Sequence, residues 1–238
     1  MKAFLLAGGR GERLRPLTLA CPKCLVPING VPLLGIWLDR CRQEGIDAVL
    51  LNVSHHAGLV REFLAGRTGP PHVELVVEAE PRGTAGTVAA NRWFVEGDES
   101  FWIVYADNLT NLSLGAMLAA HQANRGVLTM ALFRAPDPSA AGIVELSPDG
   151  CIVSFEEKPR RPRSDLANAG IYLARAGLLG ELPDADGRVL DFGFDVLPRL
   201  AGRMYGHVAD GFTVDIGTPA ALARASLVWA AEGEKALR

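Results

Sequence analysis

Leu6-Ala-Gly-Gly-Arg-Gly-Glu-Arg-Leu-Arg-Pro-Leu-Thr18, followed shortly by Pro22-Lys23, is the most informative stretch of this chain. Its glycines come directly after the apolar run Phe4–Ala7, which predicts a buried strand. Glycines at 8, 9 and 11 allow a tight turn with no Cβ to block a ligand. Backbone N–H groups in such a turn bind anions, and nearby cations add positive charge: Arg10, Arg13, Arg15 and Lys23. The stretch therefore predicts a polyphosphate site.

The composition favours a small anionic ligand over a polymer. The chain has 238 residues, enough for one large α/β domain, with 49% hydrophobic and 21% charged residues. Its 24 Lys and Arg against 27 Asp and Glu give a net charge of −3. Since no Lys/Arg block is long enough for a nucleic-acid footprint, we expect no nucleic-acid partner.

Nothing in the sequence resembles a targeting or membrane segment. Met1-Lys2-Ala3 runs directly into the first strand, without the apolar length of a signal peptide. No apolar run approaches the ~20 residues that a membrane helix needs. We therefore expect a cytoplasmic protein with no membrane association.

The four cysteines, at 21, 24, 41 and 151, do not form the pattern of a disulfide framework. Cys21-Pro-Lys-Cys24 is a C-x-x-C pair, but Cys41 and Cys151 are too scattered to complete a zinc site. The pair also follows an arginine-rich loop rather than a helix start within a βαβ unit. We interpret it as an incidental flank of Lys23.

Strand-like and helix-like segments alternate in the first half. The expected strands are Ala3–Ala7, Ala48–Val53, Val73–Val77, Phe101–Ala106 and Val127–Phe133, and the expected helices are Pro32–Arg42, Thr84–Phe94 and Ser113–Ala123. Such alternation predicts right-handed βαβ units in an α/β fold, with a mostly parallel mixed sheet and helices on both faces.

After about residue 135 the pattern becomes richer in β-structure. Gly142–Leu146 and Cys151–Phe155 flank the turn Ser147–Gly150 and predict a hairpin. Further on we expect a strand at Asn168–Leu173, a short helix at Phe194–Leu200, an extended pair over Tyr205–Ile216 bent at Asp210-Gly211, and a final helix at Pro219–Ala231. This part is expected to bind substrate.

Two acidic residues fall where strands of the sheet are expected to end. Ligands of open α/β sheets bind beyond the carboxyl ends of the strands, where the glycine turn, Asp107 and Asp215 are expected. Mg²⁺ takes one or two carboxylates and completes its shell with phosphates and water. Each aspartate alone could be a cap or turn residue, but together with the glycine turn they predict a Mg²⁺–nucleotide site.

The glycine stretch matches neither a Walker A motif nor a dinucleotide fingerprint, since Leu14 stands in place of the third glycine. Residues 6–18 and 22–28 resemble, almost residue for residue, the signature loop of the sugar-1-phosphate nucleotidylyltransferases (NDP-sugar pyrophosphorylases). Five further segments resemble that family's motifs in the same order: Glu80–Gly86, Ala106-Asp107, Phe155–Pro159, Asn168–Tyr172 and Val214–Thr218. Two positions depart from it, since Ala106 replaces a usual Gly and Thr213 a frequent Trp.

The resemblance implies a single Rossmann-like nucleotidyltransferase domain over 1–238. Residues 1–135 would form its nucleotide-binding part, 136–218 a β-rich sugar-binding part and 219–238 the C-terminal helix, without the β-helix domain of longer members. The implied activity transfers a nucleoside monophosphate from an NTP to a sugar 1-phosphate, giving an NDP-sugar and pyrophosphate. Mg²⁺ is the implied cofactor.

The resemblance also implies a role for each matching residue. Arg13, Lys23 and Lys158 would be catalytic, Asp107 and Asp215 would bind Mg²⁺, and Gly142, Glu157 and Asn168 would bind the sugar. The implied nucleotide-binding residues are Leu6, Ala7, Gly8, Gly9, Gly11, Glu78, Gly83 and Thr84.

Glu78 favours GTP as the nucleotide. Guanine presents two adjacent donors, N1–H and N2–H₂, that one carboxylate can accept, whereas uracil presents a single donor between two acceptors. This would place the chain with mannose- or heptose-1-phosphate guanylyltransferases. A uridylyl or other nucleotidylyl transfer to a different sugar phosphate is the alternative.

Two other classes of protein remain open. A non-catalytic subunit that senses nucleotide sugars would use the same fold, but all the implied catalytic residues are present. A glycosyltransferase would have a D-x-D pair where this chain has Asp107-Asn-Leu. Apolar residues in the last helix, such as Leu227 and Trp229, could pack on the core or form a homo-oligomer.

Overall fold

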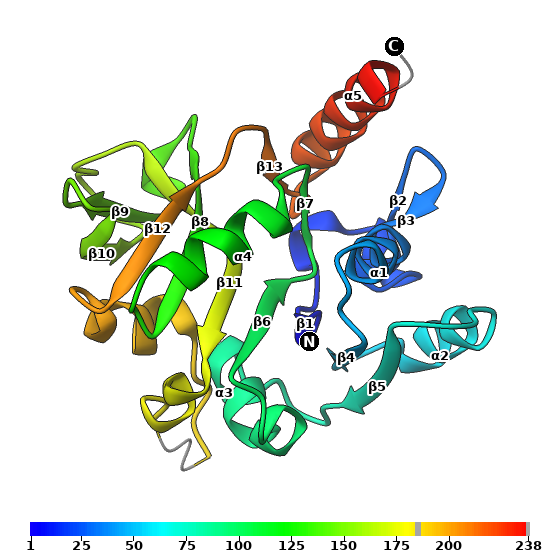
Figure 1. The fold of residues 1–238 in the computed structure, drawn as a ribbon. Coiled ribbons are helices and arrows are strands. Elements are labelled where there is room, and N and C mark those ends of the chain that lie inside the picture. The colour runs from blue at the N-terminus through cyan, green and yellow to red at the C-terminus, as the bar shows by residue number, and fades with distance from the viewer. Residues whose placement is uncertain (184–186, 237–238) are drawn as a thin grey trace. The chain divides into compact units, whose positions relative to one another are not determined.

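The computed structural model describes residues 1–183 and 187–236, which divide into two compact units (Figure 1). Unit 1 comprises Met1–Phe4, Arg82–Val104 and Leu112–Gly211, and unit 2 comprises Leu5–Pro81, Tyr105–Asn111 and Phe212–Arg238. Strands β1 (Lys2–Leu6) and β6 (Ser100–Tyr105) each begin in unit 1 and end in unit 2. The segments that follow both strands therefore belong to unit 2.

Unit 1 contains a mixed sheet. Its strands lie in the order β6, β11 (Leu166–Arg175), β8 (Leu128–Arg134), β12 (Met204–Val208), β10 (Cys151–Glu157) and β9 (Gly142–Leu146). Strand β11 is antiparallel to both β6 and β8, and β10 to both β12 and β9, whereas β12 and β8 are parallel. The sheet is completely buried at its centre, where Ile171 and Leu173 of β11 have no exposed surface.

Helix α4 (Leu114–Ala123) packs against β8, β11 and β12 (Figure 1). It begins after Ser113, whose hydroxyl accepts the N–H of Ala116 at 3.1 Å. The other helical segments of unit 1 are α3 (Thr84–Ala90), η4 (Arg92–Val95), η5 (Pro138–Ala140), η6 (Ala176–Gly180), η7 (Phe192–Val196) and η8 (Leu197–Leu200).

Unit 2 is built around the parallel strands β4 (Ala48–Val53) and β5 (His72–Val77). Two short antiparallel ribbons accompany them, β2 (Pro27–Ile28) with β3 (Val31–Pro32) and β7 (Asn108–Thr110) with β13 (Thr213–Asp215). Its helical segments are η1 (Glu12–Leu14), η2 (Leu17–Leu19), η3 (Lys23–Leu25), α1 (Leu33–Gln43), α2 (Ala57–Ala65) and α5 (Pro219–Ala236).

The α/β class and the mixed sheet expected from the sequence are confirmed. Unit 1 contains more antiparallel pairing than the βαβ alternation alone predicts, because β11 inserts between β6 and β8. The extended segments expected over Tyr205–Ile216 do not pair with each other, since β12 pairs in unit 1 and β13 in unit 2. Each unit contains residues from both halves of the chain.

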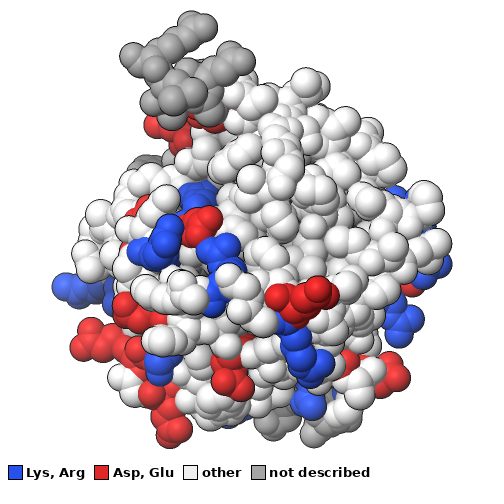
Figure 2. Space-filling model, turned by 90° about the vertical axis from the view of Figure 1, so that its right-hand side faces the viewer, with Lys and Arg blue, Asp and Glu red and all other residues white. Residues whose placement is uncertain are grey.

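Charged side chains of both signs are interspersed on the face drawn in Figure 2, in keeping with the net charge of −3. Within residues 1–183 and 187–236, no helix combines the length and apolar character needed to cross a membrane.

Candidate active site

The glycine loop after β1 is held by side chains from the end of β4. The Asn52 side-chain oxygen accepts the N–H of Ala7 at 2.9 Å, and the Ser54 hydroxyl donates to the carbonyl oxygen of Gly8 at 2.7 Å. Gly8 must lack a side chain, because a Cβ would lie 2.6 Å from Asn52 Nδ2. The loop is therefore fixed in position before any ligand binds.

The C-terminal part of the glycine loop is held by a hydrogen bond within the loop. Gly11 has a φ of +64°, a conformation that favours glycine, and its carbonyl oxygen accepts the hydroxyl of Thr18 at 2.7 Å. In the described part of the chain, no backbone hydrogen bond is donated by the N–H groups of residues 8–11. These groups remain available to an anion, as the sequence predicts.

The short ribbon of β7 and β13 brings two distant aspartates together. Asp215 lies opposite Asn108 in the ribbon, and the N–H of Ile216 donates to the carbonyl oxygen of Asp107 at 3.1 Å. The convergence of the two carboxyl groups expected from the sequence is therefore present in the structure. It depends on a strand pairing that spans more than a hundred residues of chain.

Lys23 lies between these two carboxylates. Its Nζ donates to Asp107 Oδ2 and to Asp215 Oδ1, each at 2.7 Å, and the lysine side chain is only 8% exposed. Burial by itself lowers the pKa of Lys23, but the two carboxylates outweigh it and the pKa lies above its ordinary value. The amine is therefore held as a charged ammonium.

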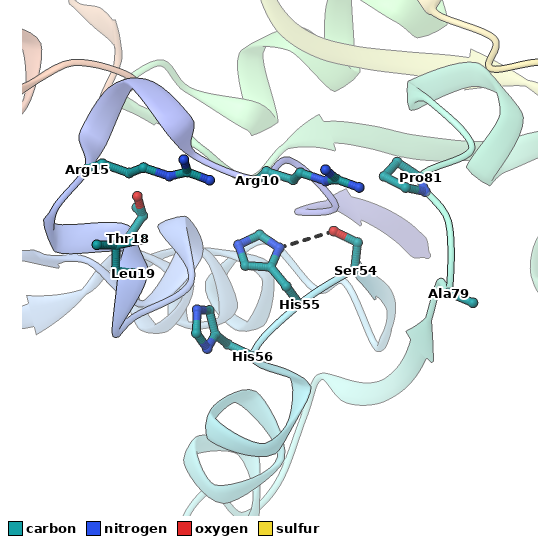
Figure 3. Close-up of a pocket in the computed structure, with 9 residues that line it drawn as sticks. All are labelled: Arg10, Arg15, Thr18, Leu19, Ser54, His55, His56, Ala79 and Pro81. Carbon is teal, nitrogen blue, oxygen red and sulfur yellow. Dashed lines mark hydrogen bonds between the residues drawn. The ribbon is translucent and has the colours of Figure 1, made fainter.

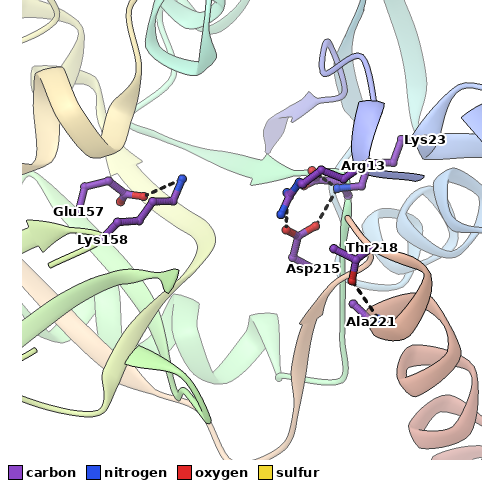
Figure 4. Close-up of polar contacts among 8 residues, drawn as sticks. Arg13, Lys23, Glu157, Lys158, Asp215, Thr218 and Ala221 are labelled. Atoms are coloured by element: carbon purple, nitrogen blue, oxygen red, sulfur yellow. Dashed lines mark hydrogen bonds and ion pairs between the residues drawn. The ribbon is translucent and has the colours of Figure 1, made fainter. Parts of the chain in front are cut away.

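Arg13 approaches the same aspartate from the glycine loop (Figure 4). Its Nη2 lies 3.4 Å from Asp215 Oδ2. Gly217 permits this approach, because a Cβ there would lie 2.7 Å from Arg13 Nη2 and 3.0 Å from both Asp215 oxygens. Just beyond it, the Thr218 hydroxyl accepts the N–H of Ala221 at 3.2 Å and caps α5.

A polar pocket of about 300 Å³ lies beside the glycine loop in unit 2 (Figure 3). Two of its residues, His55 and His56, directly precede helix α2. The pocket is lined by Arg10, Arg15, Thr18, Leu19, Ser54, His55, His56, Ala79 and Pro81.

His55 lines this pocket as a neutral imidazole. Since the Ser54 hydroxyl donates to Gly8, its oxygen accepts from His55 Nδ1 at 3.1 Å, which leaves Nε2 unprotonated. Nε2 is buried and has no hydrogen-bond partner among the described residues. Burial, then His56 and Arg10, lower the pKa of His55 and keep it neutral.

Glu78 follows β5 and lies against the glycine loop. It is only 4% exposed, its N–H donates to the carbonyl oxygen of Val53 at 2.8 Å, and its Oε2 would lie 3.4 Å from a Cβ on Gly8. The structure therefore places this carboxylate beside the loop that the sequence assigns to the nucleotide.

Unit 1 contains a second polar cluster, formed around Glu157. The Glu157 carboxylate packs against two glycines, since a Cβ on Gly142 or on Gly193 would lie 2.6 Å from Oε2. Burial raises the pKa of Glu157, Lys158 opposes this rise and Asp191 adds to it. The carboxylate is thus partly desolvated, with glycine on two sides.

Lys158 adopts an uncommon backbone conformation, with a φ of +50°. Its N–H donates to the carbonyl oxygen of Ala141 at 3.0 Å, and its exposed Nζ lies 3.9 Å from Glu157 Oε1 (Figure 4). Strained residues of this kind concentrate at functional sites.

Asn168 stabilises an irregularity in β11. Its side-chain oxygen accepts the N–H of Gly170 at 2.8 Å and its Nδ2 donates to the Tyr172 hydroxyl at 2.7 Å, where the register with β8 shifts. One N–H and one lone pair of the amide remain for a ligand.

The remaining predicted nucleotide residues, Gly83 and Thr84, lie in unit 1. Gly83 has a φ of +79° and packs against the backbone of Leu190. The Thr84 hydroxyl donates to Asp191 Oδ2 at 2.9 Å and accepts the N–H of Phe192 at 2.8 Å. Asp191 and Gly193 were not predicted from the sequence. The segment Asp191-Phe-Gly, which follows a loop, is the feature of the sequence that could have indicated them.

The cysteine pair shows no sign of thiolate chemistry. Burial raises the pKa of Cys24 to about 12 and also raises the pKa of Cys21. A thiol that resists ionisation is a poor nucleophile and metal ligand. The structure thus supports the interpretation of the pair as a flank of Lys23.

A glycine loop with available N–H groups and two converging carboxylates at strand ends define an α/β protein with a candidate site for phosphate and a divalent ion. The chain belongs to the nucleotidyl transferase family, whose family model matches residues 2–232.

Its relatives include mannose-1-phosphate guanylyltransferases of Mycobacterium tuberculosis, 34% identical over 94% of this chain, and of Arabidopsis thaliana, 31% identical over 92%. The chain spans 63% and 62% of their respective lengths. Two solved structures of HddC from Yersinia pseudotuberculosis share the fold. They match with TM-scores of 0.78 and 0.77, at 22% and 23% identity, over 95% of this chain and 98% of theirs.

Proposed function

We propose that this protein transfers GMP from GTP to a sugar 1-phosphate, forming a GDP-sugar and pyrophosphate. The observation that carries the proposal is the convergence of Asp107 and Asp215 on Lys23, within the unit that contains the glycine loop. The family membership and the similarity to mannose-1-phosphate guanylyltransferases support it.

The reaction needs no general base. A phosphate monoester has a second pKa near ~6, so the attacking oxygen of the sugar phosphate is already anionic at neutral pH. The barrier is the approach of two anions, which repel by about 4 kcal/mol per charge pair at 4 Å and an effective dielectric of 20. Arg13 would bind the departing pyrophosphate and Lys23 the phosphates near the reacting centre, where both offset this repulsion.

The donor set of unit 2 fits Mg²⁺. Asp107 and Asp215 supply two carboxylates that already share one cation, the Lys23 ammonium, and Mg²⁺ commonly takes one or two carboxylates with phosphates and water. Among the described residues no group of three or more His, Cys, Asp and Glu forms a closed metal cage. When bound, Mg²⁺ would neutralise phosphate charge between the reactants.

Unit 1 would bind the sugar phosphate. Lys158 would contact its phosphate, while Glu157 and Asn168 would bind its hydroxyls and Gly142 would leave room beside Glu157. The exposed ammonium of Lys158 and the partly desolvated carboxylate of Glu157 support these roles.

Glu78 supports guanine as the base, because its buried carboxylate can accept two adjacent donors. The complex of HddC with GMP-PN adds a guanine nucleotide bound to the same fold. The cytoplasmic location and a homo-oligomeric state stay predictions from the sequence.

A pyrophosphate-release assay tests this function. Purified protein is incubated with Mg²⁺, each of GTP, UTP and dTTP, and each of a panel of hexose and heptose 1-phosphates, with blanks that lack the sugar phosphate. We expect release only with both substrates and most rapidly with GTP. Binding of nucleotide sugar without release would indicate a sensing subunit, and equal rates with GTP and UTP would remove the guanine preference.

A further inference from the structure

The buried ammonium of Lys23 occupies the space between the two aspartates that would hold the divalent ion. The ammonium contacts one oxygen of each carboxylate at 2.7 Å. The Lys23 side chain is 8% exposed, whereas those of Asp107 and Asp215 are 36% and 48% exposed. The carboxylates can therefore be reached from solvent, while the cation that they share lies beneath them.

This cluster is already neutral in charge. Two carboxylates face the Lys23 ammonium, and Arg13 lies 3.4 Å from the outer oxygen of Asp215. A divalent ion binds carboxylate oxygens at about 2.1 Å. An ion placed between Asp107 Oδ2 and Asp215 Oδ1 would take the space of the Lys23 ammonium, which lies 2.7 Å from both oxygens, so the two cations cannot share this position. A bare ion would also add two charges to a balanced site and leave a buried ammonium unpaired.

We propose that Lys23 holds the two carboxylates together in the nucleotide-free protein and is exchanged for the divalent ion that arrives with the triphosphate. The inference rests on the proposed function, because the triphosphate supplies the new anionic partner for the displaced ammonium. Free metal therefore binds weakly, and metal and nucleotide enter together. Lys23 acts first as a placeholder between the aspartates and then as a phosphate ligand.

Binding of Mn²⁺ without nucleotide, followed by the EPR signal of the free ion, tests the exchange. Lys23→Met and Lys23→Gln remove the competing charge, and each is expected to bind Mn²⁺ at least about 10-fold more tightly than the wild type. Lys2→Met is the matched control, because Lys2 pairs with a single carboxylate, Asp98, at 2.8 Å. It should leave Mn²⁺ binding unchanged. Adding Asp215→Asn to Lys23→Met should abolish the gain.

Equal or weaker Mn²⁺ binding by two Lys23 variants that circular dichroism shows to be folded would overturn the exchange. So would a crystal structure with Mn²⁺ and GTP in which Lys23 still contacts both carboxylates. Pyrophosphate release by the wild type, measured on the same preparation, separates the two proposals. Turnover without a gain in Mn²⁺ affinity contradicts only the exchange, and a gain without turnover on any substrate contradicts only the proposed function.

Discussion

Gly193 lies so close to Glu157 that a Cβ at this position would be 2.6 Å from Oε2 and 2.9 Å from Cδ of the carboxylate. The N–H of Gly193 donates to Asp191 Oδ1 at 2.8 Å, which fixes the glycine where it contacts Glu157. The position of the Glu157 carboxylate therefore depends on the absence of a side chain at residue 193.

Gly193→Ala should weaken the binding of the sugar phosphate. The new methyl group would push the Glu157 carboxylate away from its present position, and we expect KM for the sugar phosphate to rise about 10-fold, or about 1.4 kcal/mol. KM for GTP should rise less, because Glu78 and the glycine loop are not altered and the contact of Asp191 with Thr84 is the one link to the nucleotide residues. Gly180→Ala is the control, since a Cβ there meets nothing within 4 Å. An equal change in both KM values would contradict the assignment of Glu157 to the sugar.

Two neighbouring glycines of the loop should respond differently to a methyl group. Gly8→Ala places a Cβ 2.6 Å from Asn52 Nδ2, whereas Gly9→Ala places one in open space. We expect Gly8→Ala to lower the free energy of unfolding by about 1–3 kcal/mol and Gly9→Ala to leave it nearly unchanged, in urea denaturation without ligand. Similar losses in the two variants would show that the loop is not held by Asn52 as described.

Much of the fold could be predicted from the sequence because its signals are local. Ala48–Val53 and Gly142–Leu146 agree with β4 and β9 residue for residue, since apolar runs bounded by turn residues define strands. The Ser113 cap likewise set the start of α4. The direction of β11 could not be predicted this way, because it depends on which strands it lies between.

The candidate site, like the fold, could be predicted from the sequence only in part. Asp107 and Asp215 could be found from their positions after strands, but the ion pairs that both make with Lys23 could not. The sequence suggests that Lys23 binds phosphate. Its ion pairs with carboxylates become evident only from the β7–β13 ribbon, which brings the two aspartates together. Asp191 could not be predicted from the sequence, because its contacts with Thr84 and Gly193 depend on tertiary structure.

Glu78→Gln should reduce the preference for GTP over UTP. An amide can accept only one of guanine's two adjacent donors, and its own NH₂ would then face a donor. A lost charged hydrogen bond costs about 1.5–3 kcal/mol, so the ratio of kcat/KM for GTP to that for UTP should fall at least about 10-fold. Glu74→Gln, at an exposed position of β5, is the control. An unchanged ratio would remove Glu78 from base selection.

Asp107→Asn should abolish turnover while the protein stays folded. The substitution keeps the shape of the side chain but removes one of two carboxylates proposed to hold Mg²⁺, a contribution of several kcal/mol. We expect kcat to fall about 10³-fold while circular dichroism shows a folded protein, since the Asp107 side chain is 36% exposed and Lys23 keeps its ion pair with Asp215. Asp39→Asn, at a surface pair with Arg67, is the matched control. Near-normal turnover with Mg²⁺ would remove Asp107 from the mechanism.

His121 should make the stability of the protein depend on pH. Burial, with a smaller contribution from Arg175, lowers the pKa of His121 to about 4, and its ring nitrogens lie 2.8 Å from Thr129 Oγ1 and 3.3 Å from Ser100 Oγ. In the unfolded chain the pKa is about 6.5. Between these two values the unfolded state binds a proton that the folded state does not, so stability falls as the pH is lowered.

The expected loss is about 1.6 kcal/mol between pH 6.5 and pH 5, because the slope rises from about half of 1.36 kcal/mol per pH unit at pH 6.5 towards the full value below it. Urea denaturation at both pH values measures it. His121→Gln keeps hydrogen-bonding groups near both hydroxyls but cannot take up a proton, so its loss over the same range should be smaller by about that amount. His72→Gln, at an exposed position, should behave like the wild type. Parallel pH curves for the wild type and His121→Gln would mean that His121 can take up its proton without unfolding, because the folded protein would then bind as many protons at this position as the unfolded chain.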